Sequence, residues 1–105
     1  MARYVLVVHS NPVDGREQEY NEWYDKRHLA DLLALPGVIA ARRYTLAQAQ
    51  VTAAPQPYRY LALYEIETED EQGWVRALHA RAGTAQMPIS EALSKTLSGV
   101  LWQAL

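Results

Sequence analysis

The feature that most constrains the fold of this chain is the order in which strand-like and helix-like patterns follow one another. Four segments have the short apolar or alternating character of β-strands, and two have the three-to-four-residue apolar spacing of helices. The strands are expected at residues 4–10, 38–46, 58–66 and 96–105, and the helices at 16–35 and 68–83. The order is therefore strand, helix, strand, strand, helix, strand, which places the chain in the α+β class.

Both helices carry signals at their ends. The first has an apolar and aromatic face made of Tyr20, Tyr24, His28, Leu32 and Leu35. It should end at the Pro-Gly pair of residues 36–37, because Pro cannot continue a helix and Gly tolerates the exit geometry. The second opens with Thr68 and has Glu71 three residues later, a capping-box pattern, and Arg81 in its last turn suits the helix dipole.

This order of elements is that of the ferredoxin-like βαββαβ fold, a four-stranded antiparallel sheet with both helices on one face. Residues 1–105 then form a single domain. The other sheet face is left bare, and a second copy of the chain would cover it.

The strand expected at 58–66 carries a row of tyrosines. Tyr58, Tyr60, Ala62, Tyr64 and Ile66 share one face of it by alternation. The sequence does not decide whether this face turns toward the helices or toward the bare side of the sheet.

Composition removes several classes of function. The net charge is −2 with no basic block, so no nucleic-acid partner is expected. The chain has no cysteine, and none of its three histidines lies three or four residues from another. We therefore expect no metal site, and the scattered glycines give no phosphate loop, so no cofactor is expected either.

The first apolar run ends at His9 and is too short for a signal-peptide core, and no run approaches the roughly 18 residues of a membrane span. No membrane association is expected, and the predicted location is cytoplasmic.

The aromatic residues are of an unusual kind, because there are 7 Tyr and 3 Trp but no Phe. Every large aromatic side chain therefore carries a hydrogen-bonding group, which suits an aromatic pocket or an interface better than a dry core. With only ten such residues, chance also explains the bias.

The first helix concentrates the candidate catalytic residues. His28 can take and return a proton near neutral pH, and Asp31, three residues later, could orient its ring. Tyr24 could donate a hydrogen bond to a substrate oxygen. The alternative for His28 is a structural hydrogen bond to the backbone, and for Tyr24 and Trp23 it is core packing.

Further residues are candidates for the walls of a substrate cavity. Arg42 and Arg43 are adjacent on the second strand and point to opposite faces, so one of them could bind a carboxylate or an enolate. The predicted substrate-binding residues are Tyr20, Trp23, Arg42, Tyr60, Tyr64 and Trp102.

Four segments resemble the small dimeric α+β barrel proteins related to the EthD family. They are VLVVHSNP at residues 5–12, EYNEWYDKRHLADLLALPGVIAARRY at 19–44, PYRYLALYEIET at 57–68 and MPISEAL at 87–93. The resemblance implies a homodimer in which two ferredoxin-like sheets close a barrel, and His28 is a motif residue in it. The wider superfamily includes cofactor-free monooxygenases, cyclases, lactone isomerases and haem-degrading enzymes, so the resemblance implies the fold and not one reaction.

The function expected from the sequence is proton-transfer chemistry without a cofactor, of the cyclase, isomerase, lyase or monooxygenase type. The expected substrate is a hydrophobic aromatic or polyketide-like small molecule. The alternatives are a non-catalytic protein that binds a phenolic compound or haem, and an accessory subunit of a catabolic pathway.

Overall fold

A computed structural model of the chain describes residues 2–105 and shows the predicted order of elements. The strands are β1 (Ala2–Ser10), β2 (Val38–Thr45), β3 (Tyr60–Thr68) and β4 (Ser98–Gln103), and the helical segments are α1 (Glu17–Trp23), η1 (Tyr24–His28), α2 (Leu29–Leu33) and α3 (Glu71–Arg81). The strands form one sheet in the order β2-β3-β1-β4, and every neighbouring pair is antiparallel. This topology confirms the ferredoxin-like prediction.

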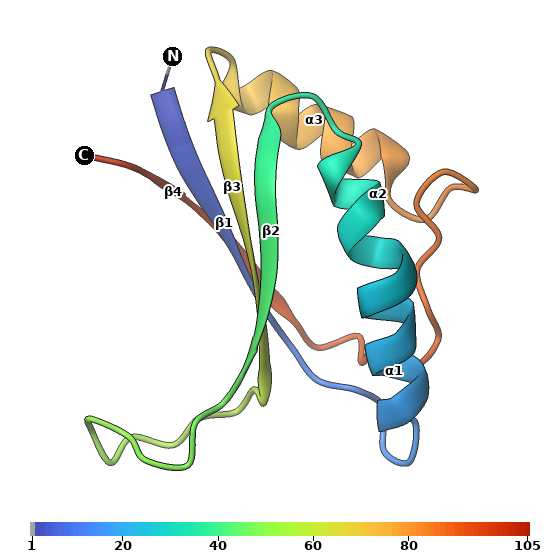
Figure 1. The fold of residues 1–105 in the computed structure, drawn as a ribbon, viewed down its shortest axis with the longest axis vertical. Coiled ribbons are helices and arrows are strands. Elements are labelled where there is room, and N and C mark those ends of the chain that lie inside the picture. The colour runs from blue at the N-terminus through green and yellow to red at the C-terminus, as the bar shows by residue number, and fades with distance from the viewer. Residues whose placement is uncertain (1) are drawn as a thin grey trace.

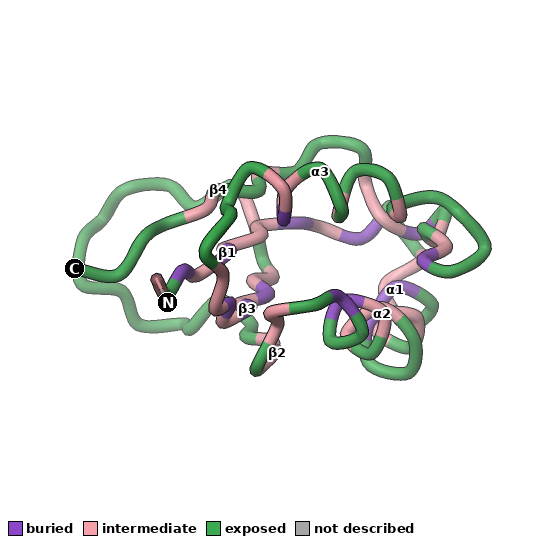
Figure 2. Tube along the Cα trace, turned by 90° about the horizontal axis from the view of Figure 1, so that it is seen from above, coloured by how far each residue is buried: buried purple, intermediate pink, exposed green. Residues whose placement is uncertain are grey.

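The helices cover one face of the sheet only. Figure 1 shows α1, α2 and α3 on the same side of the four strands, while the loop between β2 and β3 extends away from them. Seen from above in Figure 2, the buried parts of the strands and of α1 and α2 lie where the two layers face each other. The core therefore forms between helices and sheet.

Burial along β3 settles which way the tyrosine face turns. Ala62, Tyr64 and Ile66 are at most 2% exposed, as expected for residues under the helices. Tyr64 pairs with Leu6, another core residue of β1. The tyrosine face therefore belongs to the helix side. Tyr58 does not share it, because β3 begins only at Tyr60 and the Tyr58 ring lies beside His9 instead.

The opposite face, called the open face below, has no helix over it. The paired residues Val7 and Leu63 stand at its centre, partly buried by their neighbours. Ile39, Val100 and Trp102 are 49%, 43% and 63% exposed. Apolar area of this kind is seldom left to solvent by a monomeric protein.

A β-bulge near the start of β2 determines which arginine faces the helices. The pairing of β2 with β3 shifts between Val38 and Ala40, so that alternation is interrupted there. After the bulge, Arg43 pairs with Ala62 and shares its helix-facing side, whereas Arg42 pairs with Leu63 on the open face. Without the extra residue Arg42 would have shared the face of Val38.

The first helix contains a π-helical turn that the sequence analysis did not anticipate. It occupies Tyr24–His28, between the α-helical segments α1 and α2. Residues Tyr20, Tyr24, His28 and Leu32 are each four positions apart, and an α-helix with 3.6 residues per turn would rotate them steadily off one face. The π-turn contains more residues per turn, so it keeps these side chains on one face of the helix. Such π-turns are frequent at functional sites.

The predicted capping box of the second helix was wrong by two residues. Thr68 still belongs to β3, where it pairs with Ala2, so the helix starts later than predicted. Asp70 is the N-cap instead, and its carboxylate accepts a hydrogen bond of 2.9 Å from the backbone N–H of Gly73. The Thr68 hydroxyl accepts one from the backbone N–H of Asp70.

Gly37 makes the tight return from the first helix into β2 possible. Its φ is +89°, and a Cβ atom there would come within 2.5 Å of the Glu67 carbonyl oxygen. The Gly37 carbonyl accepts a 2.8 Å hydrogen bond from Glu67 N–H, so the turn is fixed to the end of β3. The Pro-Gly stop was predicted correctly.

Candidate functional site

Six of the predicted site residues come together between the first helix and the sheet. We call this group, with Arg43, the tyrosine–histidine cluster: Tyr20, Trp23, Tyr24, His28, Arg43, Tyr60 and Tyr64. The Tyr20 ring lies 5.4 Å from Tyr24 and 5.2 Å from Tyr60, measured between centroids. These are favourable separations for aromatic pairs.

Arg43 occupies the centre of the rings and is the arginine that the predicted site should have contained. Its guanidinium carbon lies 4.5 Å from the centroid of Tyr24 and 5.3 Å from those of Tyr20 and Tyr60. It donates hydrogen bonds of 2.8 Å to Asp25 and Asn21. Arg43 is therefore held by cation–π contacts and by charge on the helix, and its side chain is only 12% exposed.

A row of buried hydroxyls lies beneath these rings. The Ser10 hydroxyl and the Tyr20 hydroxyl are 2.6 Å apart and hydrogen-bonded. The Tyr24 hydroxyl faces those of Ser10 and Tyr64, and burial raises the pKa of Tyr20, Tyr24 and Tyr64 alike. All three phenols are therefore neutral near pH 7 and can donate a hydrogen bond.

The hydroxyl of Tyr64 is buried and lies near that of Tyr24, but no group within residues 2–105 meets it with the geometry of a hydrogen bond. Such a group costs about 1–3 kcal/mol unless something satisfies it. A buried donor without a partner, on a side chain 1% exposed, indicates a place where a ligand oxygen or a water molecule could bind.

His28 is enclosed by aromatic rings. It stacks on Trp23 with 4.4 Å between centroids and meets the edge of Tyr24 at 5.1 Å. Burial lowers the pKa of His28 to about 4, although the negative charge of Asp31 acts in the opposite direction. The imidazole is therefore neutral at pH 7, and its buried Nδ1 has no hydrogen-bond partner within residues 2–105.

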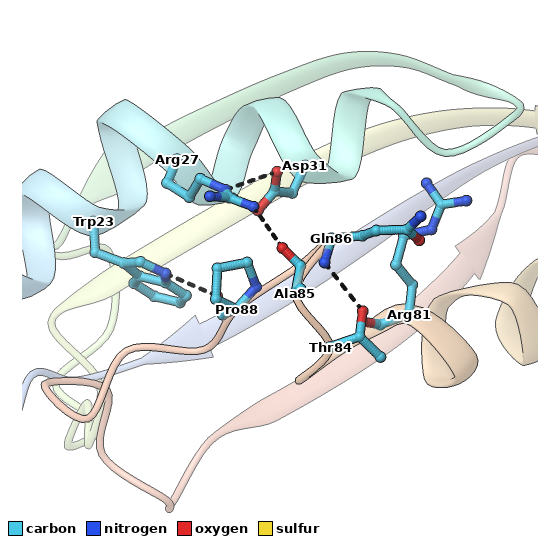
Figure 3. A network of polar contacts seen from close by, with 8 residues as sticks. All are labelled: Trp23, Arg27, Asp31, Arg81, Thr84, Ala85, Gln86 and Pro88. Carbon is cyan, nitrogen blue, oxygen red and sulfur yellow. Dashed lines mark hydrogen bonds and ion pairs between the residues drawn. The ribbon is translucent and has the colours of Figure 1, made fainter.

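Asp31 does not orient His28, contrary to the role suggested by their spacing. Its carboxylate accepts hydrogen bonds of 3.1 and 2.9 Å from Arg27 Nε, and no hydrogen bond joins it to the imidazole among the described residues. Figure 3 shows this ion pair on the outer side of the helix, facing the segment that follows α3. The charged guanidinium of Arg27, four residues away, binds the Asp31 carboxylate more strongly than the neutral His28 ring would.

The same figure shows how residues 84–88 are tied to the first helix. Arg27 Nη2 donates a 3.0 Å hydrogen bond to the Ala85 carbonyl, and Trp23 Nε1 donates one of 3.0 Å to the Pro88 carbonyl (Figure 3). Met87, between them, is 0% exposed. The segment thus braces the outer side of Trp23, whose ring stacks on His28.

Two predicted site residues lie elsewhere. Arg42 and Trp102 are on the open face, 62% and 63% exposed, and Arg42 approaches Glu65 at 3.9 Å. The prediction that they share one cavity with Tyr60 and Tyr64 was wrong, because the sheet separates them. Tyr60 donates a short hydrogen bond to Glu17 and accepts one from Asn21.

The sequence analysis missed several groups that hold the cluster together. Ser10, Asn21, Asp25 and Glu17 hydrogen-bond Tyr20, Arg43 and Tyr60. Asn21 and Asp25 are four residues apart on the helix, a spacing that could have predicted a shared partner. Ser10 carries no such signal, because its partner depends on how the strand and helix pack.

Within residues 2–105, no three histidine, aspartate or glutamate side chains converge as a metal site would require. In the same range no helix is long and apolar enough to cross a membrane. The cluster itself is close-packed, since Tyr20, Tyr24 and Tyr64 are at most 2% exposed. A ligand larger than water could reach it only if some of these side chains moved.

Three solved structures share the fold of this chain. A candidate monooxygenase from Shewanella loihica superimposes with a TM-score of 0.61 and 14% identity over 100% of this chain and 97% of that one. An EthD family protein from Bacillus halodurans superimposes with a TM-score of 0.56 and 12% identity over 100% of both chains. The haem degrader MhuD from Mycobacterium tuberculosis, in a structure with two haems bound in its active site, superimposes with a TM-score of 0.64. The identity is 16% over 97% of this chain and 95% of that one.

No family model matches the chain, and no curated protein matches it in sequence. The structural matches nevertheless confirm, at the level of the fold, the resemblance to EthD-related proteins that the sequence suggested. The chain has the ferredoxin-like fold that an EthD family protein, a candidate monooxygenase and a haem degrader also have.

Proposed function

We propose that this chain is a homodimeric enzyme that performs proton-transfer chemistry, without a cofactor, on a hydrophobic aromatic or polyketide-like small molecule. The observation that carries the proposal is that one aromatic cluster contains two buried polar atoms without a hydrogen-bond partner in residues 2–105, the Nδ1 of His28 and the hydroxyl of Tyr64. A buried polar group without a partner lowers the stability of the fold. Proteins typically keep such groups where the groups serve function.

Each residue has a role in this proposal. His28, neutral at pH 7, accepts a proton from the bound molecule. Tyr24 and Tyr64 donate hydrogen bonds to the oxygen that becomes negative in the same step. Tyr20 and Trp23 form the aromatic walls, and Arg43 supplies a positive potential from behind the rings. Removal of a proton from the substrate is a first step compatible with a cofactor-free cyclase, isomerase, lyase or monooxygenase.

A two-ring phenol, 2-naphthol, would test whether the cluster binds such molecules. We expect 2-naphthol to shift the Cε1–H NMR signal of His28, because its ring would enter beside the imidazole as the surrounding aromatic side chains move apart. Signals of His79, which is exposed on α3, should not move. If the His28 signal stays in place at saturating 2-naphthol, the cluster is not a site for aromatic phenols.

The second candidate function is binding of haem or a phenolic compound without turnover, including service as an accessory subunit of a catabolic pathway. One observation favours haem: MhuD has the same fold and its structure contains two haems. A neutral imidazole such as that of His28 is also a suitable axial ligand for haem iron. Adding haemin to the wild-type protein would give a Soret shift that His28→Gln removes, whereas an enzyme for phenols would show neither.

Phenylalanine substitutions separate functional from structural tyrosines in the cluster. Tyr64→Phe removes a hydroxyl that has no partner, so we expect the free energy of unfolding to rise by about 1 kcal/mol. Tyr20→Phe removes the buried hydrogen bond to the Ser10 hydroxyl and should lower the free energy of unfolding by about 1 kcal/mol. Urea unfolding of both variants measures the two effects. A loss of stability in Tyr64→Phe would mean that its hydroxyl already has a structural partner.

The homodimer is the part of the proposal that concerns the open face. Leu63 stands at its centre, between Val7 of β1 and Arg42 of β2. Leu63→Asp should convert a particle of two 11.9 kDa chains into a folded monomer, because the new carboxylate would be buried between the sheets. Light scattering after gel filtration measures the mass of the particle, and circular dichroism shows whether the variant is folded.

The control for this variant is Gln72→Asp, in the first turn of α3, where an exposed acidic residue suits the helix dipole. It should stay dimeric. A wild-type chain that is monomeric at all concentrations would refute the pairing of open faces.

A further inference from the structure

A small cavity lies at the end of the sheet where β1 and β2 end and β3 begins, and Tyr60 of the tyrosine–histidine cluster borders it. Its volume is about 190 Å³, and it is at the end of the open face from which the β2–β3 loop extends. His9 from the end of β1, Tyr44 from the end of β2 and Tyr58 from the segment before β3 contribute aromatic walls. Leu46 and Leu61 add apolar surface.

The walls of this cavity are held in place by hydrogen bonds of Asn11. Asn11 Nδ2 donates to the Pro57 carbonyl, and its Oδ1 accepts from the backbone N–H of Arg59, both at 2.8 Å. One side chain therefore fixes the backbone on both sides of Tyr58. This fixation explains why Tyr58 leaves the alternation of β3 and lies 5.7 Å from the His9 ring.

The other wall is fixed to the same strand. The backbone N–H of Leu46 donates a 2.8 Å hydrogen bond to the Arg59 carbonyl. Tyr44 precedes it by two residues and is 46% exposed. The cavity is thus built by the ends of the strands together with the first and last residues of the β2–β3 loop, such as Ala47 and Gln56.

Charge at the rim is already balanced. Arg59 forms an ion pair of 3.3 Å with Glu17, and Glu17 also accepts the hydroxyl hydrogen of Tyr60. No uncompensated cation is therefore offered to an anionic ligand. Among the other lining residues, the Thr45 hydroxyl and the Gln56 amide donate to backbone carbonyls. The His9 imidazole and the hydroxyls of Tyr44 and Tyr58 can donate and accept hydrogen bonds to a neutral molecule.

We propose that this cavity binds a neutral aromatic compound of one ring that carries a hydroxyl group, a simple phenol. The aromatic walls would stack on the ring, and His9 or a tyrosine hydroxyl would bind the substituent. The volume is below the roughly 300–1,000 Å³ of most ligand pockets, which restricts the ligand to one ring. The site differs from the proposed catalytic cluster in its walls of His9, Tyr44 and Tyr58, although Tyr60 borders both.

The three histidines of the chain are reporters for a binding experiment with phenol itself. His9 lines the open-face cavity, His28 belongs to the tyrosine–histidine cluster and His79 is exposed on α3. After assignment by single His→Gln variants, a titration with phenol should shift the Cε1–H signal of His9 and leave that of His79 unchanged. Cyclohexanol, with the same hydroxyl but no aromatic ring, should bind at least about threefold more weakly.

Two variants locate the site. Tyr44→Leu keeps apolar bulk but loses the ring, and should weaken phenol binding at least about threefold. Ile89→Ala removes exposed apolar surface from the segment after α3, which neither lines the cavity nor belongs to the open face, and should leave the affinity unchanged. Light scattering of both variants checks that the oligomeric state is the same as in the wild type.

Several outcomes would overturn the inference. An unmoved His9 signal at saturating phenol, an equal affinity for cyclohexanol, or no effect of Tyr44→Leu each means that the cavity is not a phenol site. A shift of His28 alone would place phenol in the tyrosine–histidine cluster, so that this inference fails while the proposed function survives. If phenol shifts the His9 signal while 2-naphthol leaves the His28 signal in place, this inference survives and the proposed function fails.

Discussion

Replacing Arg43 by methionine is expected to lower the free energy of unfolding by about 3 kcal/mol. The guanidinium lies over three tyrosine rings and donates hydrogen bonds to Asp25 and Asn21, and methionine supplies neither interaction. Arg43→Lys should recover part of the loss, because it keeps the charge but not the planar donor fork. Urea unfolding at pH 7 measures all of these effects.

Arg42→Met is the matched control, one residue away on the opposite face. Arg42 is 62% exposed and its nearest carboxylate oxygen, on Glu65, is 3.9 Å away, so its loss should change stability by less than about 0.5 kcal/mol. Equal losses for the two variants would contradict the bulge in β2, since that bulge alone puts Arg43 and not Arg42 among the rings.

Acidification should destabilise the protein through His28. Its pKa is about 4 in the folded chain, below the roughly 6.5 of an unfolded histidine, so the unfolded state binds the proton first as the pH falls. The stability contributed by a neutral His28 is thus fully present above pH 6.5 and is lost toward pH 4. The loss is about 2 kcal/mol at pH 5 and about 3 kcal/mol at pH 4.

His28→Gln isolates this effect, because glutamine does not titrate. The difference in unfolding free energy between wild type and variant should change by about 3 kcal/mol between pH 7 and pH 4. The carboxylates are the same in both proteins, so their contributions cancel in this difference. A flat difference for His28→Gln would show that His28 is accessible to water.

The architecture was predictable because its signals are local and periodic. The alternation in residues 58–66 and the Pro-Gly stop at 36–37 each specify one element, and the order of elements then leaves few topologies. The helix-facing side of the tyrosines was not predictable, since both faces of β3 carry large apolar residues. Burial of Tyr64 beside Leu6 decides it only once the strands are paired.

The candidate site was predicted in part. The inward row of Tyr20, Tyr24 and His28 followed from helical spacing, and the structure brings these three together. Arg42 was wrongly preferred to Arg43, because a bulge depends on pairing with β3 and leaves no mark in the sequence of β2. The π-turn was missed although the strict four-residue spacing of its aromatic side chains was a visible signal.

Asp31 shows a different limit. Its distance of three residues from His28 was suitable for an orienting contact, but Arg27, four residues away, is also within reach on the helix and carries a full positive charge. Spacing identifies possible partners, and the strength of the competing interactions decides between them.

Native mass spectrometry of the freshly purified wild-type protein, compared with Tyr64→Phe, tests most directly whether the tyrosine–histidine cluster holds a small molecule. The account predicts a particle of two chains that retains an aromatic compound, which denaturation releases for identification, and a variant that is folded, dimeric and empty. A wild type without any bound compound, or equal retention by Tyr64→Phe, would contradict it.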